Sequence, residues 1–374
     1  MAYEVIFKDD VNFNFQVNRL LAYGEAACQK QEVYEATKKM HNFETWYEEW
    51  HKLAQKAELE SRFLHSMYYY RMAEFMLKDD DPRKDEMYYK MTDMFSKAFP
   101  KMKRHKIPFR DGYLPCLYLK AEDAKNTILI HGGYDSFIEE FYLICEEFVQ
   151  AGYSIILFEG EGQGGTLRQG MKFNEKWERS VSVILNFFEL TEAALIGISW
   201  GGYFALRAAA FDKRIPRVVC FDVCYDGLDV QFRLMKQPVR AIFTLLYKLK
   251  CKRAINVLVR KKMRRDRLAD WAISHGMYIT RTDSPYEFYQ AIEKHTLQGL
   301  LNKIDQQVLL LAGEKDHYIP RWQFKFLKNN LPNAHVTARL FTEAEDGEQH
   351  CRVGNYDLAI QFILSWLKEN GEHM

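Results

Sequence analysis

The spacing of hydrophobic and polar positions changes once along the chain, about a quarter of the way from its start. Before this point, alanines, leucines, methionines and aromatic residues recur at helical intervals, as in the stretches 20–40 and 61–77. Gly24 and Pro82 are the only glycine and the only proline in the first 99 residues. The pattern predicts a helical domain over residues 1–104, whose aromatic side chains either fill a core or face a substrate cavity.

After this point, short apolar runs alternate with amphipathic stretches of ordinary helix length. Fully apolar strands flanked by helices indicate a mostly parallel sheet that is covered on both faces. The sequence therefore predicts an α/β fold in a second domain, residues 105–374. The predicted strands are 114–120, 127–131, 154–159, 193–199, 217–222, 307–313 and 336–341.

One interval breaks this alternation, because about 80 residues with a helical pattern separate the strands at 217–222 and 307–313. We interpret residues 228–300 as a helical lid inserted into the second domain. Within it, residues 230–267 contain thirteen Lys or Arg and one acidic residue, Asp266. This stretch is either the solvated face of amphipathic helices or a basic wall that attracts an anionic substrate or partner.

The composition excludes several classes of protein. The chain has 374 residues, a formal net charge of +1, 48% hydrophobic residues and 15% aromatic residues. This apolar content excludes a disordered chain. The balanced charge argues against a dedicated nucleic-acid-binding protein. No run of about 18 apolar residues is present, so we expect no membrane span.

Cysteine and histidine usage narrows the chemistry further. The seven cysteines are scattered and form no C-x-x-C pair, so a cytoplasmic protein without a disulfide scaffold is expected. The start of the chain lacks the basic and apolar segments of a signal peptide. The eleven histidines show no zinc-binding spacing, and we expect neither a metal nor a cofactor.

The strongest chemical signal is the run Gly197-Ile198-Ser199-Trp200-Gly201, which follows an apolar strand and precedes an alanine-rich helix. It matches G-x-S-x-G in the strand–turn–helix context that this motif requires. Glycines two positions before and after the serine remove Cβ atoms that would clash in a sharp turn. Ser199 is therefore the candidate nucleophile.

A serine nucleophile needs a base, and with this motif the chain order is serine, acid, histidine. Asp316 follows the strand at 307–313, and His350 follows the strand at 336–341. Both lie where parallel sheets place their functional sites. We expect His350 to take the Ser199 proton and return it to the leaving group, while Asp316 orients the imidazole and stabilises its charged form.

Three residues compete for these roles, namely Asp222 and Asp226 as the acid and His317 as the base. The two aspartates follow the strand after the candidate nucleophile. His317 adjoins the predicted acid, too close in sequence to reach across to the serine in the usual geometry. In the alternative interpretation, Asp316 caps a helix and His350 is a capping or surface histidine.

An oxyanion hole requires backbone amides that face the nucleophile. We expect one donor to be the amide of Trp200, because it follows the serine. The second is expected from Gly133 or Tyr134, which follow the strand at 127–131. The alternative is an ordinary turn at the strand exit, with His131 as a structural hydrogen-bonding residue.

The Gly-rich segment 159–165 superficially resembles a phosphate-binding loop. It lacks the Gly-Lys-Ser/Thr ending of such loops, and its two acidic residues would repel phosphate. We therefore exclude a nucleotide site and expect a tight loop beside the candidate nucleophile.

Together these motifs resemble the α/β-hydrolase superfamily over residues 105–372. The stretch 132–136 with Glu139 and Glu140, the turn at 160–165 and the His350-Cys351 pair resemble a branch with a helical domain before the catalytic one. That branch includes the fermentation–respiration switch protein family and carbon–carbon-bond hydrolases. Similar chains are often called acylaminoacyl or dipeptidyl peptidases. Because the peptidases proper carry a β-propeller instead, the helical first domain argues against peptidase activity.

The resemblance implies an α/β-hydrolase fold with Ser199, Asp316 and His350 as its triad. The carbon–carbon-bond hydrolases of this branch use a further acid after the strand that follows the nucleophile. Asp226 and Asp229 are the candidates for that accessory acid.

Three functions follow from these observations. The first is a serine hydrolase that cleaves an ester or amide of a small apolar or aromatic acyl substrate through an acyl-enzyme on Ser199. The second is a carbon–carbon-bond hydrolase of acylated aromatic ketones, with acylaminoacyl peptidase-like activity as a variant. The third is a hydrolase-like regulatory binding protein, against which a complete set of triad residues argues. The sequence leaves the oligomeric state open. A homodimer is one alternative, by analogy with other helical N-terminal regions that mediate dimers.

Overall fold

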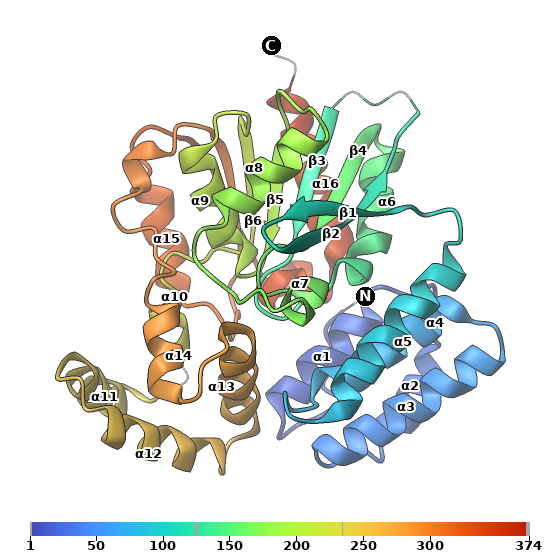
Figure 1. Cartoon of the computed structure of the whole chain (residues 1–374), viewed down its shortest axis with the longest axis vertical. Helices are drawn as coiled ribbons and strands as arrows, with labels where there is room; N and C mark the ends of the chain where they lie inside the picture. The colour runs from blue at the N-terminus through green and yellow to red at the C-terminus, as the bar shows by residue number, and fades with distance from the viewer. Residues whose placement is uncertain (1, 123, 125, 234, 372–374) are drawn as a thin grey trace.

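A computed structural model describes residues 2–122, 124, 126–233 and 235–371. Its centre is an eight-stranded sheet in the order β1-β2-β4-β3-β5-β6-β7-β8 (Figure 1). β2 is antiparallel to β1 and β4, and the strands from β3 to β8 are mutually parallel. The strands are β1 Arg104–Phe109, β2 Gly112–Leu119, β3 Asn126–His131, β4 Tyr153–Phe158, β5 Ala194–Ile198, β6 Arg217–Phe221, β7 Gln307–Gly313 and β8 His335–Phe341.

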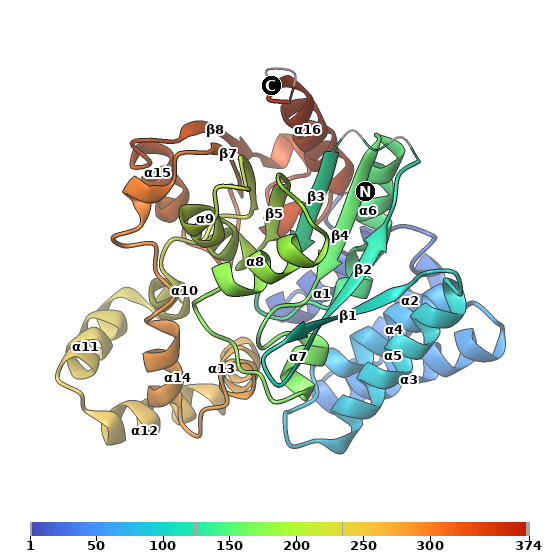
Figure 2. The same cartoon turned by 45° about the horizontal axis from the view of Figure 1, so that its top comes forward.

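Alternate residues of the parallel strands pack into two hydrophobic cores, one on each face of the sheet. In β3, Ile128 and Ile130 belong to the core that contains α6 and α16, whereas Leu129 belongs to the core of α8, α9 and α15 (Figure 2). The predicted mostly parallel sheet with helices on both faces is confirmed. These helices are α6 Tyr142–Gln150, α8 Glu178–Phe187, α9 Gly201–Phe211, α15 Arg321–Asn329 and α16 Tyr356–Glu369.

Five helices precede the sheet and lie together at the lower right of Figure 1, as the helical pattern predicts. Pro82 occupies the first turn of the last of them, and the Asp81 side chain caps it by accepting a hydrogen bond from the Arg83 amide. Trp46 and Trp50 are fully buried, so many of the aromatic side chains fill a core. The five helices are α1 Val11–Leu21, α2 Lys30–Thr37, α3 Phe43–Leu59, α4 Phe63–Phe75 and α5 Pro82–Ala98.

A further group of helices lies between β6 and β7, where the sequence predicts a lid. In Figures 1 and 2 they extend away from the sheet on the side opposite α2–α5. Within the described residues, no helix is both long enough and apolar enough to cross a membrane. These helices are α10 Gly227–Arg233, α11 Gln237–Lys248, α12 Lys252–Met263, α13 Arg267–Thr280 and α14 Pro285–Ile292, and the short α7 Gly164–Arg168 follows β4.

The predicted strands coincide with observed ones to within two residues at each end. The stretch 114–120, predicted as half of a hairpin, corresponds to β2, and its partner is β1. β1 begins at Arg104, one residue before the predicted start of the second domain. Because β2 pairs with β4, this hairpin extends the parallel sheet as its antiparallel edge.

Candidate active site

Ser199 lies in the turn between β5 and α9, at the carboxyl edge of the sheet. Its φ of +63° is a left-handed conformation that non-glycine residues adopt at a cost in free energy. A Cβ at Gly197 would lie 2.0 Å from the Gly201 carbonyl oxygen, so this position requires glycine. The strand–turn–helix geometry is that of a nucleophile elbow.

His350 and Asp316 form a hydrogen-bonded chain with Ser199. The Ser199 Oγ lies 2.8 Å from His350 Nε2, and His350 Nδ1 lies 2.7 Å from Asp316 Oδ2. The amides of Tyr318 and Ile319 donate to Asp316 Oδ1 at 2.8 and 2.9 Å. The structure brings the three predicted residues together because the carboxyl ends of β5, β7 and β8 share one edge of the sheet.

A second acid, Asp222, also contacts the imidazole. Its Oδ2 lies 3.1 Å from His350 Nδ1. Arg352 Nη2 donates to both Asp222 oxygens at 2.7 Å, and the Cys351 amide donates to Oδ2 at 2.6 Å. Of the competing acids considered from the sequence, Asp222 is the one that lies beside His350, together with Asp316.

The two carboxylates change the protonation of the site. Burial lowers the pKa of His350. The charge of Asp316 and hydrogen bonds with both acids outweigh this effect and raise the pKa to well above its usual value. Burial raises the pKa of Asp222, but the charge of Arg352 and the contacts with His350 hold it well below its usual value. Asp222 is therefore a buried carboxylate that stays ionised at neutral pH.

The loop after β3 lies beside Trp200, the residue that follows Ser199. A Cβ at Gly133 would lie 2.6 Å from the Trp200 amide nitrogen. The Gly133 amide donates to Ser136 Oγ at 3.3 Å, and its carbonyl accepts from Gln163 Nε2 at 2.8 Å. Among the described residues, the amides of Trp200 and Tyr134 have no hydrogen-bond acceptor. Tyr134, rather than Gly133, thus has the amide without a competing partner.

Ser199 and His350 line the same cavity. Its walls come from α1, from the carboxyl edge of the sheet and from α13 in the predicted lid. They are mainly apolar, with Phe15 from α1 and Trp271 from α13 among them. Some aromatic residues of the helical domain therefore do face a cavity, as one of the two sequence interpretations proposed.

Gln231, on α10, is an exception to this apolar lining. Its side chain borders the cavity and the residue is 5% exposed. Its Oε1 atom is buried and has no hydrogen-bond partner within the part of the chain that the structure describes. A buried acceptor without a partner is costly.

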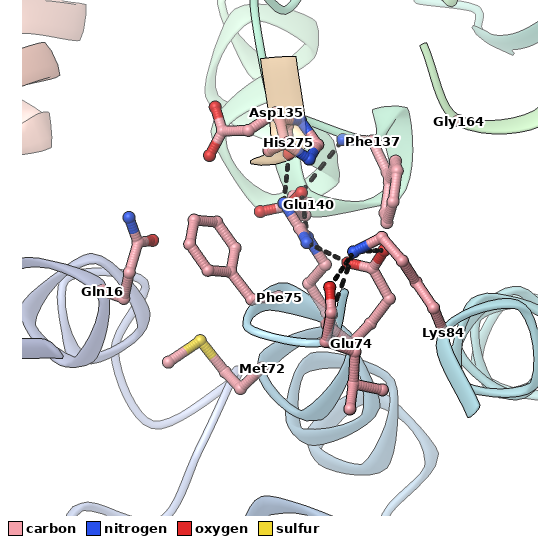
Figure 3. Close-up of polar contacts among 12 residues, drawn as sticks. Gln16, Met72, Glu74, Phe75, Lys84, Asp135, Phe137, Glu140, Gly164 and His275 are labelled. Atoms are coloured by element: carbon pink, nitrogen blue, oxygen red, sulfur yellow. Dashed lines mark hydrogen bonds and ion pairs between the residues drawn. The ribbon is translucent and has the colours of Figure 1, made fainter. Parts of the chain in front are cut away.

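Buried ion pairs connect the N-terminal helices to the loop after β3. Arg19 of α1 pairs with Asp135 at 3.1 Å and with Glu140 at 2.5 Å. Arg71 of α4 pairs with Glu140 and with Glu74, both at 2.6 Å. Figure 3 shows Glu74, Glu140 and Asp135 close together at this junction. Ion pairs from α1 and α4 therefore hold the loop that carries the candidate oxyanion donor.

The predicted accessory acids lie elsewhere. Asp226 and Asp229 are at the start of α10 and are not among the residues that line the cavity. Asp226 Oδ1 accepts from the Asp229 amide at 2.9 Å. Asp229 pairs with Arg240 and accepts from Trp322 Nε1 at 2.8 Å. Both carboxylates thus have protein partners, and the structure does not bring them to Ser199.

His131 is fully buried beneath the loop, with its Nδ1 2.9 Å from the Gly132 carbonyl oxygen. Burial lowers the pKa of His131 to about 4, so it stays neutral. Potential metal ligands meet within 4.8 Å at one place in the described chain, where Asp222, His350 and Cys351 lie. Because Arg352 already neutralises Asp222, this cluster is part of the hydrogen-bonded chain described above rather than a separate centre.

Three residues of the site were not identified from the sequence, namely Arg352, Arg19 and Gln231. They sit in no motif, and Arg19 and Gln231 reach the cavity from helices that are distant in sequence from Ser199. Of the three, only Arg352 could have been suspected from the sequence, because it lies two residues after His350.

Two fungal proteins are related in sequence over most of this chain. The chain is 29% identical to the hydrolyase poxO of Penicillium oxalicum, over 96% of this chain and 97% of that protein. It is 26% identical to the hydrolase acrC of Aspergillus aculeatus, over 88% of this chain and 89% of that protein. The chain is a hydrolase of the α/β-hydrolase type.

A solved structure has the same fold as this hydrolase throughout, the helical N-terminal region included. The 2,6-dihydroxy-pseudo-oxynicotine hydrolase superposes with a TM-score of 0.73, covers 94% of each chain and is 17% identical. No protein-family model matches the hydrolase.

Proposed function

We propose that this hydrolase cleaves a carboxylic ester or amide through an acyl-enzyme on Ser199. The observation that carries the proposal is the hydrogen-bonded chain from Ser199 through His350 to Asp316 at the wall of the cavity. His350 accepts the Ser199 proton as Oγ attacks the acyl carbon, and it returns that proton to the leaving group. Water then attacks the acyl-enzyme. His350 accepts a proton from this water and returns it to Ser199 Oγ as the acyl group leaves.

The oxyanion that forms during each attack is stabilised by the amides of Trp200 and Tyr134. Both amides lie in turns beside Ser199 and have no acceptor among the described residues. Such donors act strongly because they are already oriented and need no reorganisation during the reaction. The glycine at position 133 supports the assignment, because the absence of a Cβ there allows the two turns to lie close together.

The proposed substrate has an apolar or aromatic acyl group. Phe15, Leu268 and Trp271 border the cavity, and together they favour such a group over a charged one. A second candidate substrate is an aryl β-diketone, for which Ser199 would attack a ketone carbon and a carbon–carbon bond would break. This second candidate rests on the apolar lining of the cavity.

Two experiments test the proposal. A fluorophosphonate probe should label the wild-type enzyme and not Ser199→Ala, and equal labelling of both would contradict the assignment of the nucleophile. Turnover of p-nitrophenyl esters is expected from an esterase. Turnover of aryl β-diketones without turnover of these esters would instead support the carbon–carbon-bond reaction.

A further inference from the structure

α11, α12 and the connection between them form a helical pair at the outer edge of the molecule (Figures 1 and 2). Of the thirteen large hydrophobic side chains that are exposed in the described chain, six lie in this pair. Each is between 46% and 67% exposed, so this is a concentration of apolar surface rather than scattered residues. They are Val239, Ile242, Leu245, Leu249, Val257 and Leu258.

The helical spacing gathers these residues on the outer side of each helix. Val239, Ile242 and Leu245 follow one another at intervals of three, which keeps them on one face of α11. Phe243 of α11 and Ile255 of α12 are buried in the core beneath the pair. Helical spacing places Phe243 beside Val239 and Ile255 beside Leu258. The exposed residues therefore extend the apolar stripe of each helix beyond the part that packs onto the protein.

The charges of the pair have one sign. Residues 236–265 contain eleven Lys or Arg and no acidic residue. Three of these cations form ion pairs: Arg240 with Asp229, Lys252 with Glu287, and Lys262 with Asp266. Within the described residues, the other eight have no carboxylate partner. They are Lys236, Lys248, Lys250, Arg253, Arg260, Lys261, Arg264 and Arg265.

We propose that the α11–α12 pair binds the surface of a membrane that contains anionic lipids. Apolar side chains flanked by Lys and Arg are the composition of amphipathic helices that lie in the membrane interface. The apolar residues would enter the boundary between headgroups and acyl chains, while the cations contact anionic headgroups. Because eight cations lack a carboxylate partner, the pair is complementary in charge to an anionic surface.

A second copy of the chain fits this surface less well. In a symmetric dimer the same patch meets itself, which would bring the unpaired cations of both copies face to face. Like charges in such an interface are strongly unfavourable. The basic stretch that the sequence singled out is thus explained by an anionic surface rather than by self-association.

The position of the pair connects it to the active site. α13 follows α12 directly, and its residues Leu268, Trp271 and Ala272 line the cavity. Membrane binding through α11 and α12 would hold the cavity close to the lipid phase, in which apolar molecules concentrate. The proposal is independent of the reaction that Ser199 performs.

Co-sedimentation of the full chain with vesicles tests this proposal. Vesicles of phosphatidylcholine with phosphatidylserine should bind the protein, and vesicles of phosphatidylcholine alone should bind it far less. Lys248→Gln with Lys250→Gln should lower the partition coefficient about 30-fold, since each cation contributes about five-fold. Ile242→Gln with Leu245→Gln should also weaken binding. Matched changes on α15, Lys325→Gln with Lys328→Gln, should leave binding unchanged.

The outcomes separate the alternatives. Equal binding to both kinds of vesicle, or equal loss in the α15 variant, would overturn the proposal. So would a concentration-dependent dimer that Ile242→Gln with Leu245→Gln abolishes, with no vesicle binding by the wild type. All variants should retain wild-type hydrolysis of a water-soluble ester, which verifies their fold and keeps this test distinct from that of Ser199.

Discussion

The Asp222 carboxylate lies 3.1 Å from His350 Nδ1, the same nitrogen that Asp316 approaches at 2.7 Å. The two acids come from the ends of neighbouring strands, β6 and β7, and both are buried. Arg352 neutralises Asp222 with two hydrogen bonds, whereas Asp316 is held by backbone amides. His350 therefore has two carboxylates placed to fix its tautomer.

This arrangement predicts that Asp222 partly replaces Asp316 when Asp316 is removed. We expect Asp316→Asn to lower kcat about 10²-fold, short of the loss of about 10⁴-fold that follows when the only acid of a triad becomes Asn. Asp316→Asn with Asp222→Asn should reach the larger loss. The measurement is kcat for the two single variants and the double variant, with the exposed Asp305→Asn as a control. If Asp316→Asn alone is as inactive as the double variant, Asp222 gives no support.

Asp222 also predicts a shift in the pH profile. Asp222→Asn removes a negative charge beside His350 and leaves Arg352 without its partner, so the pKa of His350 should fall. His350 must be unprotonated to accept the Ser199 proton, so activity disappears below the pKa of His350. The acidic limb of kcat/KM against pH should therefore move to lower pH in this variant. An unchanged limb, or one at higher pH, would count against a catalytic effect of Asp222.

The oxyanion turn predicts sensitivity at Gly133. Gly133→Ala places a Cβ 2.6 Å from the Trp200 amide nitrogen, and this contact must push the two turns apart. Misplacing one donor should lower kcat about 10²–10³-fold with a much smaller change in KM. Thermal unfolding of the variant distinguishes this effect from a loss of fold. A variant with normal kcat would show that Tyr134 and Trp200 are not the donors.

The sequence is sufficient to predict the sheet, because apolar strands between helices have few other arrangements. Ser199, Asp316 and His350 could be predicted as a group because each follows a strand whose carboxyl end reaches the same edge. The sequence could not predict which of the acids after β6 contacts His350, since this depends on side-chain direction in a turn. That direction brings Asp222 to His350 and turns Asp229 towards Arg240. The cavity could not be predicted from the sequence either, because α1 and α13 meet only in the folded chain.

Gln231 predicts a feature of the substrate. If its unpaired Oε1 accepts a hydrogen bond from a hydroxyl or amide N–H of the substrate, Gln231→Leu should raise KM about 10-fold for substrates with that donor. For esters without the donor, KM should not rise. The same change should stabilise the unliganded protein in urea denaturation, because it removes a buried acceptor that lacks a partner. Equal effects on KM for both kinds of substrate would exclude this role.

Arg71 allows a prediction of how much the buried ion pairs between the N-terminal helices and the loop after β3 contribute to stability. Its buried guanidinium lies between Glu74 and Glu140 and also donates to the Asp135 carbonyl. Arg71→Met leaves buried carboxylates without this cation, and we expect the free energy of unfolding to fall by about 3–5 kcal/mol. Arg83→Met, which removes a more exposed pair, should lower it by about 1 kcal/mol or less. Urea denaturation measures both, and equal losses would show that burial adds nothing at this junction.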